Sequence, residues 1–251
     1  MLKRRIIPIE LLDQGRLVKS VNFDAPRDVG NPVKSSHVYS DQDADELVIL
    51  NIERENRSIA ALVEVVKPIA HECFVPLTVG GGIRCLDDAA QLFATGADKV
   101  LINSVAYSQP SLITEISEQY GRQAVVVGID VRYQDKQFLL FSDCGGQYEA
   151  VSLAVHVENV VESGAGEIMI QSIDRDGAMN GYDLQLLEEV IALSPVPVIA
   201  AGGAGDFIHL KQAFDTGVDA AACGSLFNFG DNNPIRAKAF LKNYNIPLKK
   251  I

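Results

Sequence analysis

Short apolar runs alternate along this chain with stretches in which apolar residues recur every three or four positions. The runs are rich in Val, Ile and Leu, which is typical of strands covered on both faces. Residues 60–70 and 88–96 have helical spacing, and the second segment ends on glycine, a common helix stop. We predict strands over residues 5–11, 46–52, 75–80, 98–103, 123–130, 167–172, 196–201 and 219–224. Eight strands with intervening helices predict one (β/α)8 barrel domain over residues 1–251, and an open doubly wound sheet is the alternative.

The two halves of the chain resemble each other. Residues 75–104 match residues 196–225 at an offset of 121 positions, with ten identities in 30. The same offset pairs Glu46 with Glu167. The repeat predicts a barrel built from two duplicated half-barrels of four βα units each.

The repeat places one glycine-rich turn in each half, at Gly80-Gly81-Gly82 and at Gly202-Gly203-Ala204-Gly205. Glycine after a strand exposes backbone N–H groups, and the following helix presents its positive N-terminus, so each turn can hold an anion. The duplication favours a ligand with a phosphate at both ends. Alternatively, the glycines only permit tight turns. The candidate phosphate-binding residues are Gly81, Gly82, Asn103, Ser104, Gly202, Gly203, Gly224 and Ser225.

Three polar residues near predicted strand ends are catalytic candidates, because barrel active sites lie at the C-terminal face. Asp130 ends the fifth strand and could act as an acid or base, or else cap a helix or pair with Arg132. Asp176 follows the sixth strand and could cap a turn or reach a substrate. Lys19 lies in the first long loop and is either a substrate or oxyanion contact or a solvated side chain.

The first strand carries Leu11 where the fifth strand carries Asp130. The neighbouring Glu10 is acidic, but strand alternation points it to the other face of the sheet. The longest strand-poor stretches, residues 13–32 and 132–149, are candidate active-site loops.

Four charged residues lie at or near the first position of predicted strands, at the opposite end of the barrel. They are Arg5, Glu46, Lys99 and Glu167. One interpretation is a set of surface ion pairs, each of which stabilises little. The other is a single ring that closes the floor of the barrel.

The net charge and the lengths of the apolar runs restrict the classes of binding partner that we expect. The 251 residues carry a formal charge of −11, so a general affinity for nucleic acid is not expected. No apolar run reaches the length of about 18 residues that a membrane span needs. The N-terminal segment lacks the pattern of a signal peptide, and together these features predict a cytoplasmic protein.

Cysteines and histidines give no sign of a metal site or a cofactor. The cysteines are Cys73, Cys85, Cys144 and Cys223, and no two have C-x-x-C spacing. We expect free thiols in a reducing compartment. The histidines, at positions 37, 71, 156 and 209, share no short motif with one another or with a cysteine, so we predict no metal.

From end to end the chain resembles the HisF family, the cyclase subunit of imidazole glycerol phosphate synthase. Matching segments include Gly15-Arg-Leu-Val-Lys19, Pro76-Leu-Thr-Val-Gly-Gly-Gly-Ile-Arg84, Ser172-Ile-Asp-Arg-Asp-Gly177 and Gly202-Gly-Ala-Gly205. The resemblance implies a (β/α)8 barrel with two phosphate-binding halves. It also implies a glutaminase partner of the HisH type on the N-terminal face, whose ammonia passes through the barrel to the C-terminal face.

Several residues take roles from this resemblance. Arg5, Glu46, Lys99 and Glu167 match the ring that gates ammonia in the family. Asp98 and Gln123 match positions that face the partner. Asp130, Lys19 and Asp176 match catalytic positions.

The catalytic centre departs from the family pattern. The family uses two aspartates as an acid/base pair, and Leu11 stands in place of the first. Three further positions differ from the family pattern. Asn51 stands in place of an acidic residue, Gln171 in place of a threonine, and Ser20 in place of the glycine after Lys19. Leucine cannot transfer a proton, and loss of one member of such a pair typically lowers the rate about 10²–10⁴-fold.

These departures leave three hypotheses. In the leading one, the barrel conducts ammonia to a third protein, an amidotransferase that makes acetamidino sugars for surface polysaccharide such as lipopolysaccharide O-antigen. In the second, the chain is a working cyclase of histidine biosynthesis that uses Asp130 with Glu10 or water. In the third, it is a non-catalytic phosphate sensor that activates the glutaminase.

Overall fold

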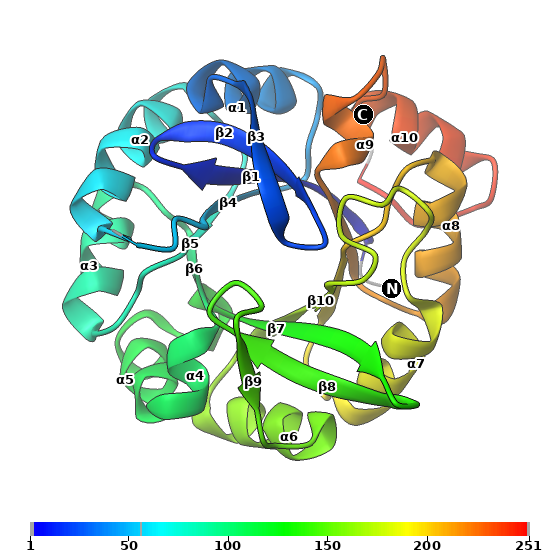
Figure 1. Ribbon diagram of the computed structural model, residues 1–251. Coiled ribbons are helices and arrows are strands. Elements are labelled where there is room, and N and C mark those ends of the chain that lie inside the picture. The colour runs from blue at the N-terminus through cyan, green and yellow to red at the C-terminus, as the bar shows by residue number, and fades with distance from the viewer. Residues whose placement is uncertain (1–2, 56, 250–251) are drawn as a thin grey trace.

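Eight parallel strands pair in a closed circle in the computed structural model, which describes residues 3–55 and 57–249 (Figure 1). The circle closes where the last strand pairs in parallel with the first, with Arg5 opposite Ala220. The (β/α)8 barrel is thereby confirmed, and the open-sheet alternative is wrong. The barrel strands are β1 (Arg5–Asp13), β4 (Leu47–Asn51), β5 (Leu77–Gly80), β6 (Lys99–Ile102), β7 (Val125–Gln134), β10 (Glu167–Ser172), β11 (Val198–Ala201) and β12 (Ala220–Cys223).

Helices form the outer ring of the barrel (Figure 1). They are α1 (Pro32–Asp41), α2 (Ile59–Glu72), α3 (Leu86–Thr95), α4 (Ser104–Ser108), α5 (Ser111–Tyr120), α6 (Leu153–Ser163), α7 (Leu184–Leu193), α8 (Phe207–Thr216), α9 (Ser225–Asn228) and α10 (Pro234–Lys242). Ser58 caps the start of α2, and Gly96 ends α3 at a φ of 116°. Among the described residues, no helix combines the length and apolarity that a membrane crossing requires.

The two stretches expected as active-site loops are instead antiparallel hairpins. After β1, the first contains β2 (Arg16–Val21) and β3 (Asp24–Gly30), and after β7 the second contains β8 (Gln137–Ser142) and β9 (Gln147–Glu149). They lie on opposite sides of the barrel axis (Figure 1). Strand β3 is mostly exposed and so lacks the apolar run of a barrel strand.

Alternation along the barrel strands separates two cores. In β1, Ile6 joins the layer between sheet and helices, whereas Ile7 and Ile9 face the barrel axis. The axial core is apolar, and β12 contributes small residues to it. Its buried members are Ile7, Ile9, Val48, Leu101, Val126, Met169, Ile199, Ala201, Ala220 and Ala222.

Three aspartates at the N-terminal end of the barrel each bond a neighbouring strand. Each lies just before the second of two adjacent strands and accepts a bond from a backbone N–H at the start of the first. The bonds run from Ile6 N to Asp45 (2.8 Å), from Leu77 N to Asp98 (2.8 Å) and from Val198 N to Asp219 (3.1 Å). The last two occupy equivalent positions of the sequence repeat. Asp45 also receives Lys238 Nζ of α10 at 2.7 Å, in an ion pair whose side chains are 3% and 4% exposed.

We expect Lys238→Met to destabilise the protein strongly, because it leaves the Asp45 carboxylate buried without its cation. Removal of one partner of a buried pair typically costs about 3–5 kcal/mol. The free energy of unfolding, measured in urea, checks this. Lys242→Met removes an exposed lysine from the same helix and serves as the control. Equal stability of the two variants would contradict the prediction.

Candidate active site

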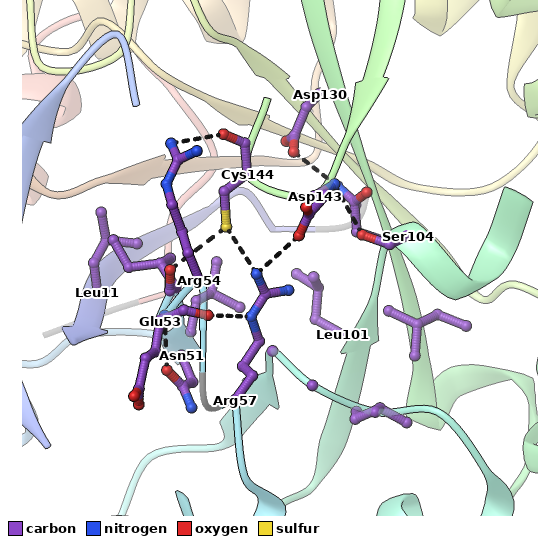
Figure 2. A pocket seen from close by; sticks show the side chains of 18 of the residues that line it. Leu11, Asn51, Glu53, Arg54, Arg57, Leu101, Ser104, Asp130, Asp143 and Cys144 are labelled. Carbon is purple, nitrogen blue, oxygen red and sulfur yellow. Dashed lines mark hydrogen bonds and ion pairs between the residues drawn. The ribbon is translucent and has the colours of Figure 1, made fainter. Parts of the chain in front are cut away.

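A cavity of about 820 Å³ opens at the C-terminal ends of the barrel strands (Figure 2). Its lining comes from several strands and from both hairpins, and includes Leu11, Asn51, Asn103, Asp130 and Gln171. This is the face on which barrel enzymes place their active sites.

Asp130 faces this cavity at the point where β7 leaves the barrel to pair with β8. Asn103 Nδ2 donates a hydrogen bond to one carboxylate oxygen at 2.9 Å. Burial raises the pKa of Asp130 to about 7; the Asn103 bond opposes that rise and the nearby Asp176 adds to it. The carboxyl group can therefore both accept and return a proton near neutral pH. It makes no ion pair with Arg132 and caps no helix among the described residues.

Leu11 lines the same cavity, whereas Glu10 does not. Glu10 is fully buried on the opposite side of β1, where it accepts a hydrogen bond from Ser36 Oγ of α1 at 2.6 Å. Burial raises its pKa to about 7. The hypothesis that Glu10 takes the place of an aspartate at position 11 is therefore wrong, because the alternation of β1 points its side chain away from the mouth.

Lys19 and Asp176 meet beside a second, smaller cavity. Lys19 is 5% exposed and donates from Nζ to the carbonyl of Ile9 at 2.7 Å, so the expectation of a solvated lysine is wrong. Burial lowers its pKa to about 8. Asp176 accepts a bond from Gln171 Nε2 at 2.9 Å, and burial raises its pKa to about 6, although Lys19 opposes this.

The structure brings the predicted phosphate-binding residues together in two groups, one in each half. Gly81, Gly82, Asn103 and Ser104 line the large cavity. Gly202, Gly203, Gly224 and Ser225 line the small one. We call these groups the first-half cradle and the second-half cradle.

The turns themselves require glycine. Gly81 and Gly203 have φ of 95° and 114°, and a Cβ at either would overlap a backbone carbonyl, of Asn51 and Gly181 respectively. The geometry of the two turns therefore requires these glycines.

The helix starts beside the cradles differ in how they are capped. Asp206 caps α8 through the N–H of Ile208, so the start of that helix is already bonded. No side chain of the described residues caps the starts of α3, α4 or α9, and Ser104 and Ser225 are the first residues of α4 and α9.

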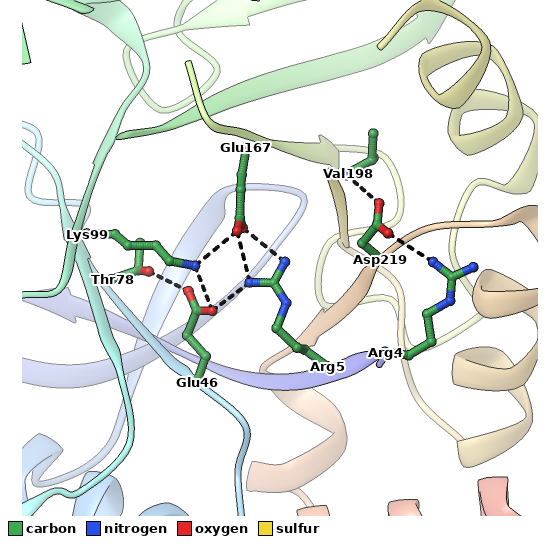
Figure 3. Close-up of polar contacts among 8 residues, drawn as sticks. All are labelled: Arg4, Arg5, Glu46, Thr78, Lys99, Glu167, Val198 and Asp219. Atoms are coloured by element: carbon green, nitrogen blue, oxygen red, sulfur yellow. Dashed lines mark hydrogen bonds and ion pairs between the residues drawn. The ribbon is translucent and has the colours of Figure 1, made fainter. Parts of the chain in front are cut away.

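The four charged residues at the other end form one closed cluster (Figure 3). Arg5 contacts Glu46 at 2.8 Å and Glu167 at 3.0 Å, and Lys99 contacts the same two carboxylates at 3.0 and 3.2 Å. We call this cluster the floor ring. Burial disfavours the guanidinium charge of Arg5, but Glu167 and Glu46 outweigh it and raise its pKa. The interpretation as separate surface pairs is wrong.

Thr78 belongs to the floor ring and was missed in the sequence. Its hydroxyl donates to the other oxygen of Glu46 at 2.6 Å. A single threonine in the buried strand Leu77–Gly80 was the available signal. Asp98 and Gln123 are exposed and lie just before β6 and β7, at this same end of the barrel.

Comparison with known proteins agrees with this architecture. Residues 5–233 match the family described as "Histidine biosynthesis protein". Three relatives carry the name "Imidazole glycerol phosphate synthase subunit HisF". The one from Exiguobacterium is 40% identical over 250 residues, covering 99% of this chain and 97% of the relative. Those from Chloroherpeton thalassium and a Thermotoga species are each 41% identical, covering 99% of this chain and 100% and 98% of theirs.

The chain belongs to the HisF family. In this HisF chain, Leu11 and Asn51 face the cavity beside Asp130. Asn51 Oδ1 is taken by the backbone N–H of Glu53 at 3.0 Å, so it acts as a turn acceptor.

Sequence reasoning missed the cavity wall of this HisF chain. Arg54, Arg57, Asp143 and Cys144 all line the large cavity. The sequence predicts a candidate active-site loop over residues 132–149, which contains Asp143 and Cys144, but its pattern does not single out either residue. All four cysteines are free thiols, and no cluster of three or more His, Cys, Asp or Glu suited to a metal ion occurs among the described residues.

We predict that Asp130 makes folding pH-dependent. Because its folded pKa is raised to about 7 from an ordinary value near 3.8, the folded chain keeps a proton that the unfolded chain releases. Its stabilising contribution is complete below about pH 4 and is lost as the pH rises through about 7.

In Asp130→Asn this loss is absent, so its free energy of unfolding should gain on that of the wild type between pH 5 and pH 8. Denaturant titrations at both pH values measure the difference. Asp231→Asn changes an exposed aspartate and should track the wild type. A constant gap between Asp130→Asn and the wild type would show that the carboxyl is already ionised at pH 5.

Proposed function

We propose that this HisF chain is the subunit of a glutamine-dependent enzyme that receives ammonia from a HisH-type glutaminase and conducts it along the barrel axis. The floor ring carries this proposal. In the floor ring, two cations and two anions are paired across the axis of the barrel. Well-packed apolar residues often stabilise a protein as well as buried ion pairs do, so stability alone does not account for four charges at this position. The names of the relatives, each a subunit of imidazole glycerol phosphate synthase, support it further.

The partner docks, in this proposal, on the end of the barrel that carries the floor ring. Asp98 and Gln123 are exposed there and are available for contacts. Ammonia enters when an ion pair of the ring parts. Above the ring, the axial core is apolar and includes Ala220 and Ala222, an environment that admits neutral ammonia more readily than ammonium.

The mouth of the barrel holds a phosphorylated ligand in this proposal, with one phosphate in each cradle. The ligand signals to the glutaminase that the site is occupied. Asp130 and Lys19 have pKa values of about 7 and 8, suited to proton transfer and to oxyanion contact near neutral pH. Leu11 faces the same space and can transfer no proton, which weakens ring closure.

We infer that the ammonia acceptor lies on a third protein, an amidotransferase of surface-polysaccharide biosynthesis that makes acetamidino sugars. The support is a contrast between the residues at the floor of the barrel and those at its mouth. The ring that would admit ammonia has all four charged members, whereas Leu11 and Asn51 are uncharged at the mouth where the family pattern is acidic.

A second candidate is a working cyclase of histidine biosynthesis. Two observations favour it: the identity of 40–41% over the whole length of relatives named as the synthase subunit, and the presence of Asp176 as a second carboxyl group at the mouth. The third candidate is a phosphate sensor that activates the glutaminase and conducts nothing.

Turnover of the family's ribulosyl substrate with ammonium distinguishes the first two candidates. We expect the wild type to turn over slowly and Leu11→Asp to be at least tenfold faster, because an acid/base partner is restored opposite Asp130. Leu50→Asp is the matched control, since Leu50 pairs with Leu11 in the register of β1 and β4 and also lines the cavity. Wild-type turnover equal to that of the Thermotoga relative would establish the histidine cyclase instead.

Blocking the axis separates a conduit from a sensor. Ala220 faces the axis, whereas its neighbour Ala221 faces the helices, so Ala220→Leu and Ala221→Leu add the same bulk on opposite sides of β12. We expect only Ala220→Leu, made in the Leu11→Asp background, to lower product formation from glutamine relative to that from ammonium, by about tenfold or more. Equal ratios in the two variants, with glutaminase activation retained, would favour the sensor.

A further inference from the structure

The turn between β8 and β9, residues 143–146, folds over the large cavity and contacts the first-half cradle (Figure 2). The backbone N–H of Asp143 donates to Ser104 Oγ at 3.0 Å, and the Asp143 carboxylate pairs with Arg57 at 3.1 Å. The turn thus bonds both to a hydroxyl of the cradle and to the cation beside it.

Arg57 lies against the glycine turn of the cradle. A Cβ placed on Gly82 would come within 3.3 Å of Arg57 Cγ, so the arginine stem packs on that glycine. The Arg57 side chain is 16% exposed, and its guanidinium also approaches Cys144 Sγ at 3.4 Å. A neighbouring arginine, Arg54, donates to the carbonyls of Cys144 and Phe23, which fixes the turn against the first hairpin.

We propose that Arg57 is the cation that anchors a phosphate group in the first-half cradle, and that Asp143 is an internal anion that holds Arg57 until the phosphate arrives. The inference rests on the proposed phosphorylated ligand and names how one end of it is recognised. A guanidinium presents its donors in a fork that fits a phosphate as well as a carboxylate, so the two compete for the same nitrogen atoms.

The ion pair between Arg57 and Asp143 is weak enough for a phosphate to replace Asp143. The Asp143 side chain is 65% exposed, and ion pairs of exposed side chains contribute little. A phosphate dianion also accepts bonds from the Ser104 hydroxyl and from the N–H groups of the glycine turn. Its arrival would therefore release the turn from both Ser104 and Arg57, which links ligand binding to the position of the second hairpin.

Titration calorimetry with inorganic phosphate tests the proposal. All proteins carry Ser225→Asp, which places a negative charge in the second-half cradle so that only the first is read. We expect Asp143→Asn to bind phosphate about three- to fivefold more tightly, the range that an exposed ion pair allows. Asp135→Asn, at the exposed β7–β8 turn of the same hairpin, is the matched control and should not differ from the parent.

Arg57→Gln should weaken phosphate binding at least tenfold, and Asp143→Asn should give no gain when added to it. Circular dichroism confirms that each variant is folded. If the parent binds phosphate but neither Asp143→Asn nor Arg57→Gln alters the affinity, the proposal is overturned while the phosphate cradle stands. If the parent, with Ser225→Asp, shows no saturable phosphate binding although the companion Ser104→Asp protein does, the first-half cradle holds no phosphate and this inference fails with it. Absence of binding in both would overturn the phosphorylated ligand of the proposed function as well.

Discussion

The strict alternation of side chains along the closed barrel determines the rest of this structure. Because successive residues of a strand point to opposite faces, β1 presents Arg5, Ile7, Ile9 and Leu11 to the axis in that order. The same rule applied around the circle gives three levels: charges at the floor, apolar side chains in the middle and polar groups at the mouth. A one-residue slip in any strand would place an axial residue among the helices.

This stacking separates the residues of the mouth from the charged residues of the floor. Leu11 and Arg5 belong to the same strand but are separated by the apolar residues Ile7 and Ile9. Substitutions at one level therefore need not disturb the packing of another.

Much of the fold and site followed from the sequence, and the reasons are physical. Barrel strands are buried on both faces, so their apolar runs mark them, and residues at their ends, such as Asp130 and Glu46, could be placed before the structure was known. Thr78 was missed because a lone threonine in a buried strand does not reveal which distant carboxylate its hydroxyl bonds. The first hairpin was missed because β3 is exposed and carries no apolar run.

Arg57 and Asp143 were beyond reach for a different reason. They come from separate loops 86 positions apart, and their contact depends on how the second hairpin folds back over the mouth. The pattern of neighbouring residues in the sequence does not predict how the hairpin folds back. The orientation of Glu10 could be inferred from the alternation of β1. Only the structure shows that its carboxyl group accepts a hydrogen bond from Ser36 of α1, in the layer between sheet and helices.

The aspartate that bonds the first residue of β5 has a consequence for any mapping of subunit contacts. Asp98 has an exposed side chain at the end of the barrel where we propose that the partner docks, but one of its carboxylate oxygens already accepts a bond from the N–H of Leu77, the neighbour of Thr78. Alanine at this position would remove the negative charge. It would also remove the acceptor of the Leu77 N–H, at the start of the strand whose Thr78 bonds Glu46. A loss of association would then have two indistinguishable origins, whereas asparagine, which keeps an acceptor oxygen, would report on the charge alone.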